Sequence, residues 1–231
     1  MEGTYTGDTV DGIRQGEGEL RFQNGDIYNG SFYQGLRHGA GVFTTENGNV
    51  VYDGMWRQSE KHGYGKERWV KSGDYYAGEY QKDSFHGHGV LYRGISQSRF
   101  EGSFVKGRKN GHGKMEFGPS TRLKTTKNDS KKEKSETGSC VYEGEWIEGR
   151  MHGQGRYTWA DSSYYEGSWS EGLINGFGKE FNASKGEFYQ GNWKMGLRHG
   201  DGAIYHKGTK QSGVWENGKH VKWTSTRASV K

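Results

Sequence analysis

One stretch, Val141 to Gly155, recurs along almost the whole chain and limits what it can fold into more than any other feature. Its frame is aromatic-x-Gly-x-aromatic, then a glycine three residues later, then a polar residue before Gly-x-Gly. Copies begin at Tyr5, Tyr28, Tyr52, Tyr76, Phe100, Tyr142, Tyr165 and Tyr189, and a degenerate copy ends at Trp215. The period is 22 to 24 residues, with one step of 42 after Phe100. Regular spacing of this length is typical of a repeat array.

The composition predicts a thin core. The chain has 41 glycines, and its hydrophobic content is only 29%. It nevertheless contains 8 Trp, 15 Tyr and 10 Phe, whereas disordered chains are poor in aromatic residues. We therefore expect an ordered, quasi-one-dimensional structure in which each unit contacts only its neighbours.

Within each unit the side chains alternate with a period of two, which is typical of β-strands. Tyr28, Gly30 and Phe32 fall on one face of a strand. Because glycine weakens a strand, we expect an aromatic ring from an adjacent strand to lie over the bare backbone. Between the two strands of a unit we expect turn residues with positive φ, at Gly12, Gly35, Ser59, Asp83, Gly107, Gly149, Gly172, Gly196 and Gly218. Each unit is thus predicted to be one β-hairpin.

The predicted fold is all-β, an array of about nine β-hairpins that form one elongated, twisted antiparallel sheet. Residues 1–117 form a first block of about five repeats, and residues 140–218 form a second block of about four. Residues 118–139, which include the only proline, form a basic insertion loop, and residues 219–231 form a basic tail. Two interpretations of the insertion stay open: a contact arm or phosphorylation site, or a tolerated insertion.

The glycines and histidines do not predict catalysis, a metal site or a cofactor. His38, His62, His86, His152 and His199 all precede Gly-x-Gly, but Gln15, Asn110 and Asn175 hold the same position elsewhere, which favours a hydrogen-bonding turn residue. No Gly-Lys pair is followed by Ser or Thr, so no phosphate loop is indicated. The chain has 28 acidic and 33 basic residues, and this mixed charge argues against nucleic-acid binding. We expect no enzymatic activity.

The chain has no apolar run near the ~20 residues that span a bilayer, and it has a single cysteine, Cys140. One cysteine excludes an internal disulfide framework and suits a reducing compartment. We therefore expect a cytoplasmic location.

The Tyr-x-Gly-x-Trp-x-x-Gly-x-x-x-Gly-x-Gly frame resembles the MORN (membrane occupation and recognition nexus) repeat over residues 5–218, apart from the insertion. MORN arrays occur in proteins as different as junctophilins, lipid kinases, radial spoke head proteins of cilia and small adaptors. A chain made only of repeats is most similar to the last two groups. The resemblance implies a structural protein of a ciliary or flagellar axoneme or another cytoskeletal assembly.

The first functional hypothesis is a scaffold or adaptor that docks partner proteins on an exposed aromatic face of the sheet. The side chains predicted to line this surface, called the twelve rings below, also have a packing role. They are Tyr28, Phe32, Tyr52, Trp56, Tyr76, Tyr80, Tyr142, Trp146, Tyr165, Trp169, Tyr189 and Trp193.

The alternative hypothesis is peripheral binding to acidic phospholipids, because clustered Lys and Arg are attracted to an anionic leaflet. The net charge of +5 permits such contact without demanding it. The residues predicted for this role are Lys106, Arg108, Lys109, Lys114, Lys131, Lys132 and Lys134. The sequence does not predict whether two chains associate.

Overall fold

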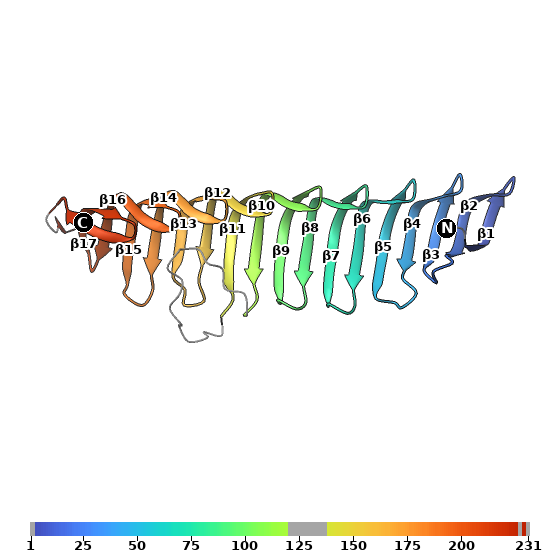
Figure 1. Ribbon diagram of the computed structural model, residues 1–231, viewed down its shortest axis with the longest axis horizontal. Helices are drawn as coiled ribbons and strands as arrows, with labels where there is room; N and C mark the ends of the chain where they lie inside the picture. Colours follow the sequence, from blue (N-terminus) through green and yellow to red (C-terminus); the bar gives the residue numbers. More distant parts are fainter. Residues whose placement is uncertain (1–2, 120–137, 226–227, 230–231) are drawn as a thin grey trace. The chain divides into compact units, whose positions relative to one another are not determined.

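The computed structural model describes residues 3–119, 138–225 and 228–229, and within these ranges every regular element is a β-strand. The chain divides into two compact units, Met1–Arg108 and Lys109–Lys231. In each unit the strands pair with their sequence neighbours in antiparallel fashion (Figure 1). The prediction of an all-β array of hairpins is confirmed.

The first unit contains four hairpins followed by a further strand. The strands are β1 (Thr4–Val10), β2 (Ile13–Arg21), β3 (Ile27–Tyr33), β4 (Leu36–Thr44), β5 (Val50–Arg57), β6 (Glu60–Trp69), β7 (Asp74–Gln81), β8 (Ser84–Arg93) and β9 (Ser98–Val105).

The second unit begins at β10 and continues through four hairpins to a short final strand. The strands are β10 (Arg108–Phe117), β11 (Cys140–Ile147), β12 (Arg150–Thr158), β13 (Tyr164–Ser170), β14 (Leu173–Asn182), β15 (Glu187–Lys194), β16 (Leu197–His206), β17 (Thr209–Glu216), β18 (Lys219–Trp223) and β19 (Ala228–Ser229). β10 pairs with β11 up to Phe117 opposite Cys140, so the insertion connects two neighbouring strands. The predicted blocks of repeats therefore do not coincide with the two units, which divide after Arg108.

The hairpin turns follow the predicted pattern. All nine expected turn positions have positive φ, including Ser59 at 65° and Asp83 at 60°. The residue before each of them also has positive φ, as at Gln34 (50°) and Glu148 (50°). Two successive residues of this kind form a type I′ turn, whose twist matches that of the two strands that it joins.

The Gly-x-Gly element forms a bulge, which the periodicity did not reveal. In the β3–β4 hairpin Gly30 faces Gly41 and Phe32 faces Arg37, so β4 has two extra residues. Gly39, with φ of 70°, lies within this bulge. A bulge bends the strand and increases its twist. Because the number of extra residues is two, Arg37 and Gly41 still point to the same face.

The core is a single layer of rings over bare glycine backbone. Tyr28 is fully buried and its hydroxyl donates a hydrogen bond to the Ser31 carbonyl at 2.9 Å. A Cβ atom built at Gly41 would lie 2.3 Å from the Tyr28 Oη, so only glycine fits beneath the ring. Tyr28 also contacts Phe32 and Trp56 edge to face, at centroid distances of 5.2 and 5.3 Å. The predicted packing of rings on glycine is confirmed.

The predicted C-terminal tail begins too early. Lys219–Trp223 is strand β18, which pairs with β17 and completes a last hairpin. Trp223 lies beside Trp215 and His220, with centroid distances of 5.9 and 3.8 Å. This last hairpin was not predicted because β18 lacks the Gly-x-Gly element found in the second strand of the other hairpins.

Candidate partner-binding surface

The twelve rings lie in the core, with exposed fractions of 0 to 6%. The expectation of an exposed aromatic face is therefore wrong. Each tyrosine except Tyr80 is covered on one side by glycine backbone, and its edges contact neighbouring rings. Their role is to hold the repeats together, and they offer almost no surface to a partner.

A row of other side chains covers the rings. It consists of the second residue after each of the first eight turn pairs, and we call it the cover row: Arg14, Arg37, Lys61, Phe85, Lys109, Met151, Ile174 and Arg198. The Arg37 guanidinium carbon lies 4.1 Å from the Trp56 ring centroid, and the Phe85 ring stacks on Tyr76 at 3.8 Å. Cations over aromatic faces are favourable contacts. Met151 and Ile174 are as buried as the rings, at 4% and 1% exposed, so the accessible chemistry of this face belongs to the other cover-row residues.

Two cover-row cations are neutralised by a glutamate. Glu67 and Glu180 occupy the same place in the repeat, two residues after Gly-x-Gly, which we call the floor position. Glu67 forms an ion pair with Lys61 and accepts a hydrogen bond from the Tyr80 hydroxyl at 2.9 Å. Glu180 accepts two hydrogen bonds from Arg198, at 2.6 and 3.1 Å.

Arg14 and Arg37 have no such counterion. The floor positions of the first two repeats hold Leu20 and Phe43. Within the described residues, no carboxylate forms an ion pair with either guanidinium. Two cations of the first unit therefore face this surface without a neutralising partner.

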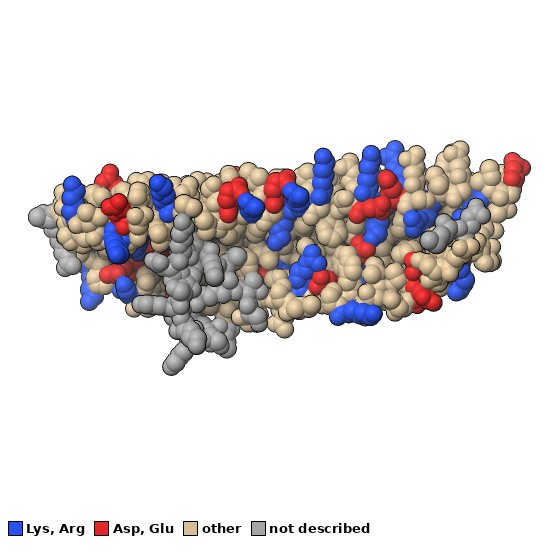
Figure 2. All heavy atoms as spheres, viewed as in Figure 1, with Lys and Arg blue, Asp and Glu red and all other residues tan. Residues whose placement is uncertain are grey.

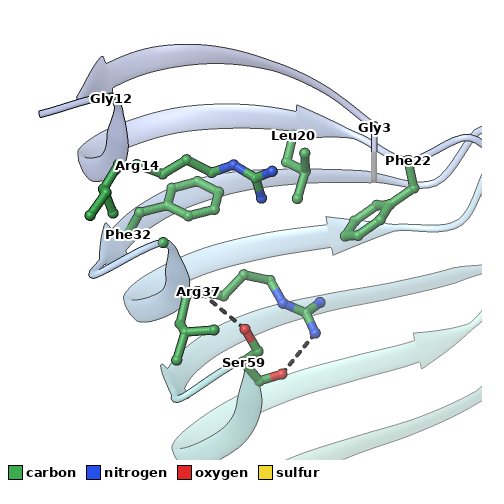
Figure 3. Close-up of a pocket in the computed structure, with 11 residues that line it drawn as sticks. Gly3, Gly12, Arg14, Leu20, Phe22, Phe32, Arg37 and Ser59 are labelled. Atoms are coloured by element: carbon green, nitrogen blue, oxygen red, sulfur yellow. Dashed lines mark hydrogen bonds between the residues drawn. The ribbon is translucent and has the colours of Figure 1, made fainter. Parts of the chain in front are cut away.

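Both arginines line a hollow of about 440 Å³ in the first unit. Figure 3 shows their side chains extending from the turn side of the hollow towards Leu20 and Phe22, with Phe32 beside them. Arg37 Nη2 donates to the Ser59 carbonyl at 2.7 Å, and the Arg37 backbone N–H donates to Ser59 Oγ at 3.2 Å. Burial lowers the pKa of the Arg37 guanidinium, which indicates a cation with incomplete solvation.

The polar residues before Gly-x-Gly form hydrogen bonds between repeats. Gln15 Oε1 accepts from the Gln34 N–H at 3.1 Å, Asn175 Oδ1 from the Met195 N–H at 3.3 Å, and His199 Nδ1 from the Asn217 N–H at 3.5 Å. Each acceptor lies one repeat before the turn that it contacts. The predicted hydrogen-bonding role is confirmed at these three positions. In the part of the chain that the structure describes, no group of three or more His, Cys, Asp or Glu is placed to hold a metal ion.

The residues predicted for acidic lipids that the structure describes do not all lie on one face of the sheet. Lys106 is an exposed turn residue, and Arg108, the first residue of β10, is exposed as well. Within β10, Lys109 lies over the Trp146 ring at 4.8 Å, whereas Lys114 points to the opposite face and pairs with Glu116 at 2.8 Å. Lys131, Lys132 and Lys134 lie outside the described residues.

Charges of both signs are interspersed on the visible face of the molecule (Figure 2). Across residues 3–119, 138–225 and 228–229, the structure has no helix long and apolar enough to cross a membrane.

Sequence reasoning missed Arg14 and Arg37 because it followed the recurring residues. The signal was available in the varying ones. An alignment of the internal copies places Arg14, Arg37, Lys61 and Arg198 in one column. In a second column, the floor position, two copies have a glutamate and the first two copies have an apolar residue.

These features define a class of protein: a β-hairpin repeat array with a one-layer aromatic core and a variable cover row. Comparison with known families identifies the class. The model of the MORN repeat matches residues 3–27, 28–50, 52–73, 76–94, 100–122, 142–164, 165–184 and 189–202. The chain belongs to the MORN repeat family. A 67-residue stretch is 34% identical to MORN repeat-containing protein 3 of Xenopus laevis, covering 26% of this chain and 28% of that protein.

Proposed function

We propose that the chain is a non-enzymatic adaptor or scaffold that docks partner proteins along its cover row. The observation that carries the proposal is the contrast between a constant framework and a variable surface. Rings, glycines and turns recur from copy to copy, whereas the half-buried cover-row positions hold Arg, Lys or Phe, and two further positions hold the buried Met151 and Ile174. A surface of unlike side chains on a rigid backbone suits specific recognition of an extended partner.

The proposed setting is a cytoskeletal assembly in the cytoplasm, with a ciliary or flagellar axoneme as the first candidate. The support is the resemblance of these repeats to those of radial spoke head proteins and small adaptors. Detergent extraction of ciliated cells that carry the tagged chain tests this setting. Retention on the axoneme is the expected result, and complete release into the detergent fraction contradicts it.

Acidic phospholipid is the second candidate ligand, favoured by the lysines of the insertion. A photo-crosslinking amino acid separates the candidates. Placed at Phe85 in the cover row, it should capture protein, whereas placed at Tyr75, on the opposite face and 36% exposed, it should not. Equal protein capture at both positions, or capture of lipid at Phe85, contradicts docking on the cover row.

A further inference from the structure

We propose that the hollow between Arg14 and Arg37 binds the carboxylate of an Asp or Glu side chain in an acidic segment of a partner protein. This inference rests on the adaptor role proposed above and specifies the chemistry of the partner. We call the hollow the arginine hollow; its charged residues are Arg14 and Arg37, and Leu20, Phe22 and Phe32 are its central apolar residues.

The chain itself shows which ligand a cover-row cation takes. Where the floor position is Glu67 or Glu180, the carboxylate binds the cation of its own or of the following repeat. In the arginine hollow the corresponding floor residues are Leu20 and Phe43, so neither cation meets a carboxylate there. An external carboxylate would complete the arrangement that the other repeats build internally.

Arg37 is held ready for such a ligand. Its guanidinium lies on the Trp56 ring, and the Ser59 carbonyl holds Nη2. Among the described residues, its other guanidinium N–H groups have no hydrogen-bond partner. A fixed planar guanidinium recognises a carboxylate with two parallel hydrogen bonds and loses less conformational entropy than a mobile one.

The charge around the hollow favours an anion. Asp83 is the acidic residue that acts on Arg37, and it is already engaged by the Lys61 backbone N–H at 2.8 Å. In the part of the chain that the structure describes, no carboxylate lines the hollow, so its two guanidinium groups leave it positive, and incomplete solvation strengthens its attraction for an anion.

The apolar lining favours a peptide over a membrane surface. Leu20 is 5% exposed and Phe32 is 3% exposed, so both form the bottom of the hollow. Arg14 lies over the Tyr5 ring at 5.5 Å, and Arg37 lies along Trp56. Neither projects as a lysine on a membrane-binding surface does. An acidic side chain beside an apolar one, as in a Glu-Leu or Asp-Phe pair, matches both parts of the hollow.

Selection of peptides by the full chain tests this inference. A phage-displayed library of random dodecapeptides is selected on the wild-type chain, and the affinity of the selected peptides is measured by fluorescence anisotropy. We expect the peptides to share an Asp or Glu next to an apolar residue. Because a hydrogen bond to a charged group is strong, Arg14→Gln and Arg37→Gln should each weaken binding by roughly tenfold to hundredfold.

Two variants control for folding and for general charge. Arg156→Gln removes a cation on the opposite face of the sheet, where it pairs with Glu166, so it should leave peptide affinity unchanged. Leu20→Glu places a carboxylate at the floor position, as Glu67 is placed in β6, and should abolish binding while keeping both arginines. Circular dichroism of each variant establishes that the sheet is intact.

Each outcome has a defined meaning. Acidic peptides that lose affinity with Arg14→Gln and Leu20→Glu but not with Arg156→Gln support the inference. Selected peptides without acidic residues, equally tight for all variants, overturn it and leave the adaptor role standing. Vesicles of equal parts phosphatidylcholine and phosphatidylserine are the lipid probe. If the chain binds these vesicles through Arg14 and no acidic peptide is selected, the inference is overturned in favour of a membrane ligand. The absence of any selected peptide and of any protein crosslinked at Phe85 overturns both proposals.

Discussion

Gly155→Ala should be one of the most destabilising single substitutions in the second unit. A Cβ atom at Gly155 would lie 2.3, 2.5 and 2.6 Å from Oη, Cζ and Cε2 of Tyr142. These three nearest atoms belong to one side chain, which is fully buried. Contacts this short cannot be relieved by small shifts, so we expect the ring to leave its place.

The magnitude follows from what Tyr142 loses. Its hydroxyl donates to the Glu145 carbonyl at 3.0 Å, a bond that contributes about 1 kcal/mol. Its edge-to-face contacts with Trp146 and Trp169, both at 5.2 Å, contribute roughly 0.5–1.5 kcal/mol each. Exposure of the ring adds about 1.5–3 kcal/mol. We expect a loss of about 4 kcal/mol, comparable with truncation of a buried aromatic residue.

Urea unfolding monitored by tryptophan fluorescence measures this loss, because Trp146 and Trp169 adjoin the site. The decisive comparison is a double-mutant cycle with Tyr142→Ala. In that background the space above Gly155 is vacant, so Gly155→Ala should cost less than about 1 kcal/mol. If the two substitutions were additive, the ring would not be the reason for this glycine.

Gly149→Ala is the matched control. Gly149 has φ of 83°, and an added Cβ there would meet nothing within 4 Å. The expected cost is the strain of a left-handed residue, about 1 kcal/mol. Ser59 and Asp83, at the same turn position with φ of 65° and 60°, indicate that the strain is tolerable. A control as destabilising as Gly155→Ala would refute the reasoning.

Four further predictions concern stability. Gly144→Val should unfold the second unit around β11, because its Cβ would lie 2.5 Å from backbone atoms of β12. We expect a loss of the circular dichroism signal, and a melting temperature equal to that of the wild-type chain contradicts this. Burial raises the pKa of Tyr189 to about 12, because the folded chain favours the neutral phenol. The free energy of unfolding should therefore be constant below pH 10 and fall between pH 10 and 12, by about 1.4 kcal/mol per pH unit for each such tyrosine. Glu67→Gln should cost on the order of 3 kcal/mol in urea unfolding because it leaves the Lys61 cation unpaired, and a neutral result contradicts a structural ion pair. Charge reversal in the insertion should leave the urea midpoint unchanged, because the stretch has almost no apolar residue; the lysines to reverse are Lys131, Lys132 and Lys134.

The hairpins could be predicted because both of their signals are local. Alternation around Gly30 defines a strand, and a turn residue such as Gly35 requires positive φ whatever surrounds it. The ring over glycine could be inferred as well, because a bare backbone inside a strand needs a close neighbour.

The exposure of the rings could not be predicted in the same way. It depends on the two-residue bulge at Gly39, which brings Arg37 opposite Phe32 and so allows it to lie over the Trp56 ring. The bulge is a property of strand pairing, and a Gly-x-Gly pattern is equally compatible with a regular strand. Although the repeat alignment marks the two arginines, the geometry of the arginine hollow could not be predicted, since Arg14 and Arg37 come together only through the pairing of β2, β3 and β4.

The two kinds of position in this repeat perform separate tasks. A ring or glycine contacts the backbone of its neighbours, so its replacement changes stability first and the surface only as a consequence. A cover-row residue such as Arg14 lies above that layer, and the floor position decides whether its charge is used internally or remains available. Lys61 with Glu67 and Arg37 with Phe43 show the two arrangements at the same pair of positions. A partner surface can therefore change repeat by repeat without disturbing the fold, and among variants of this chain the loss of stability should not correlate with the loss of binding.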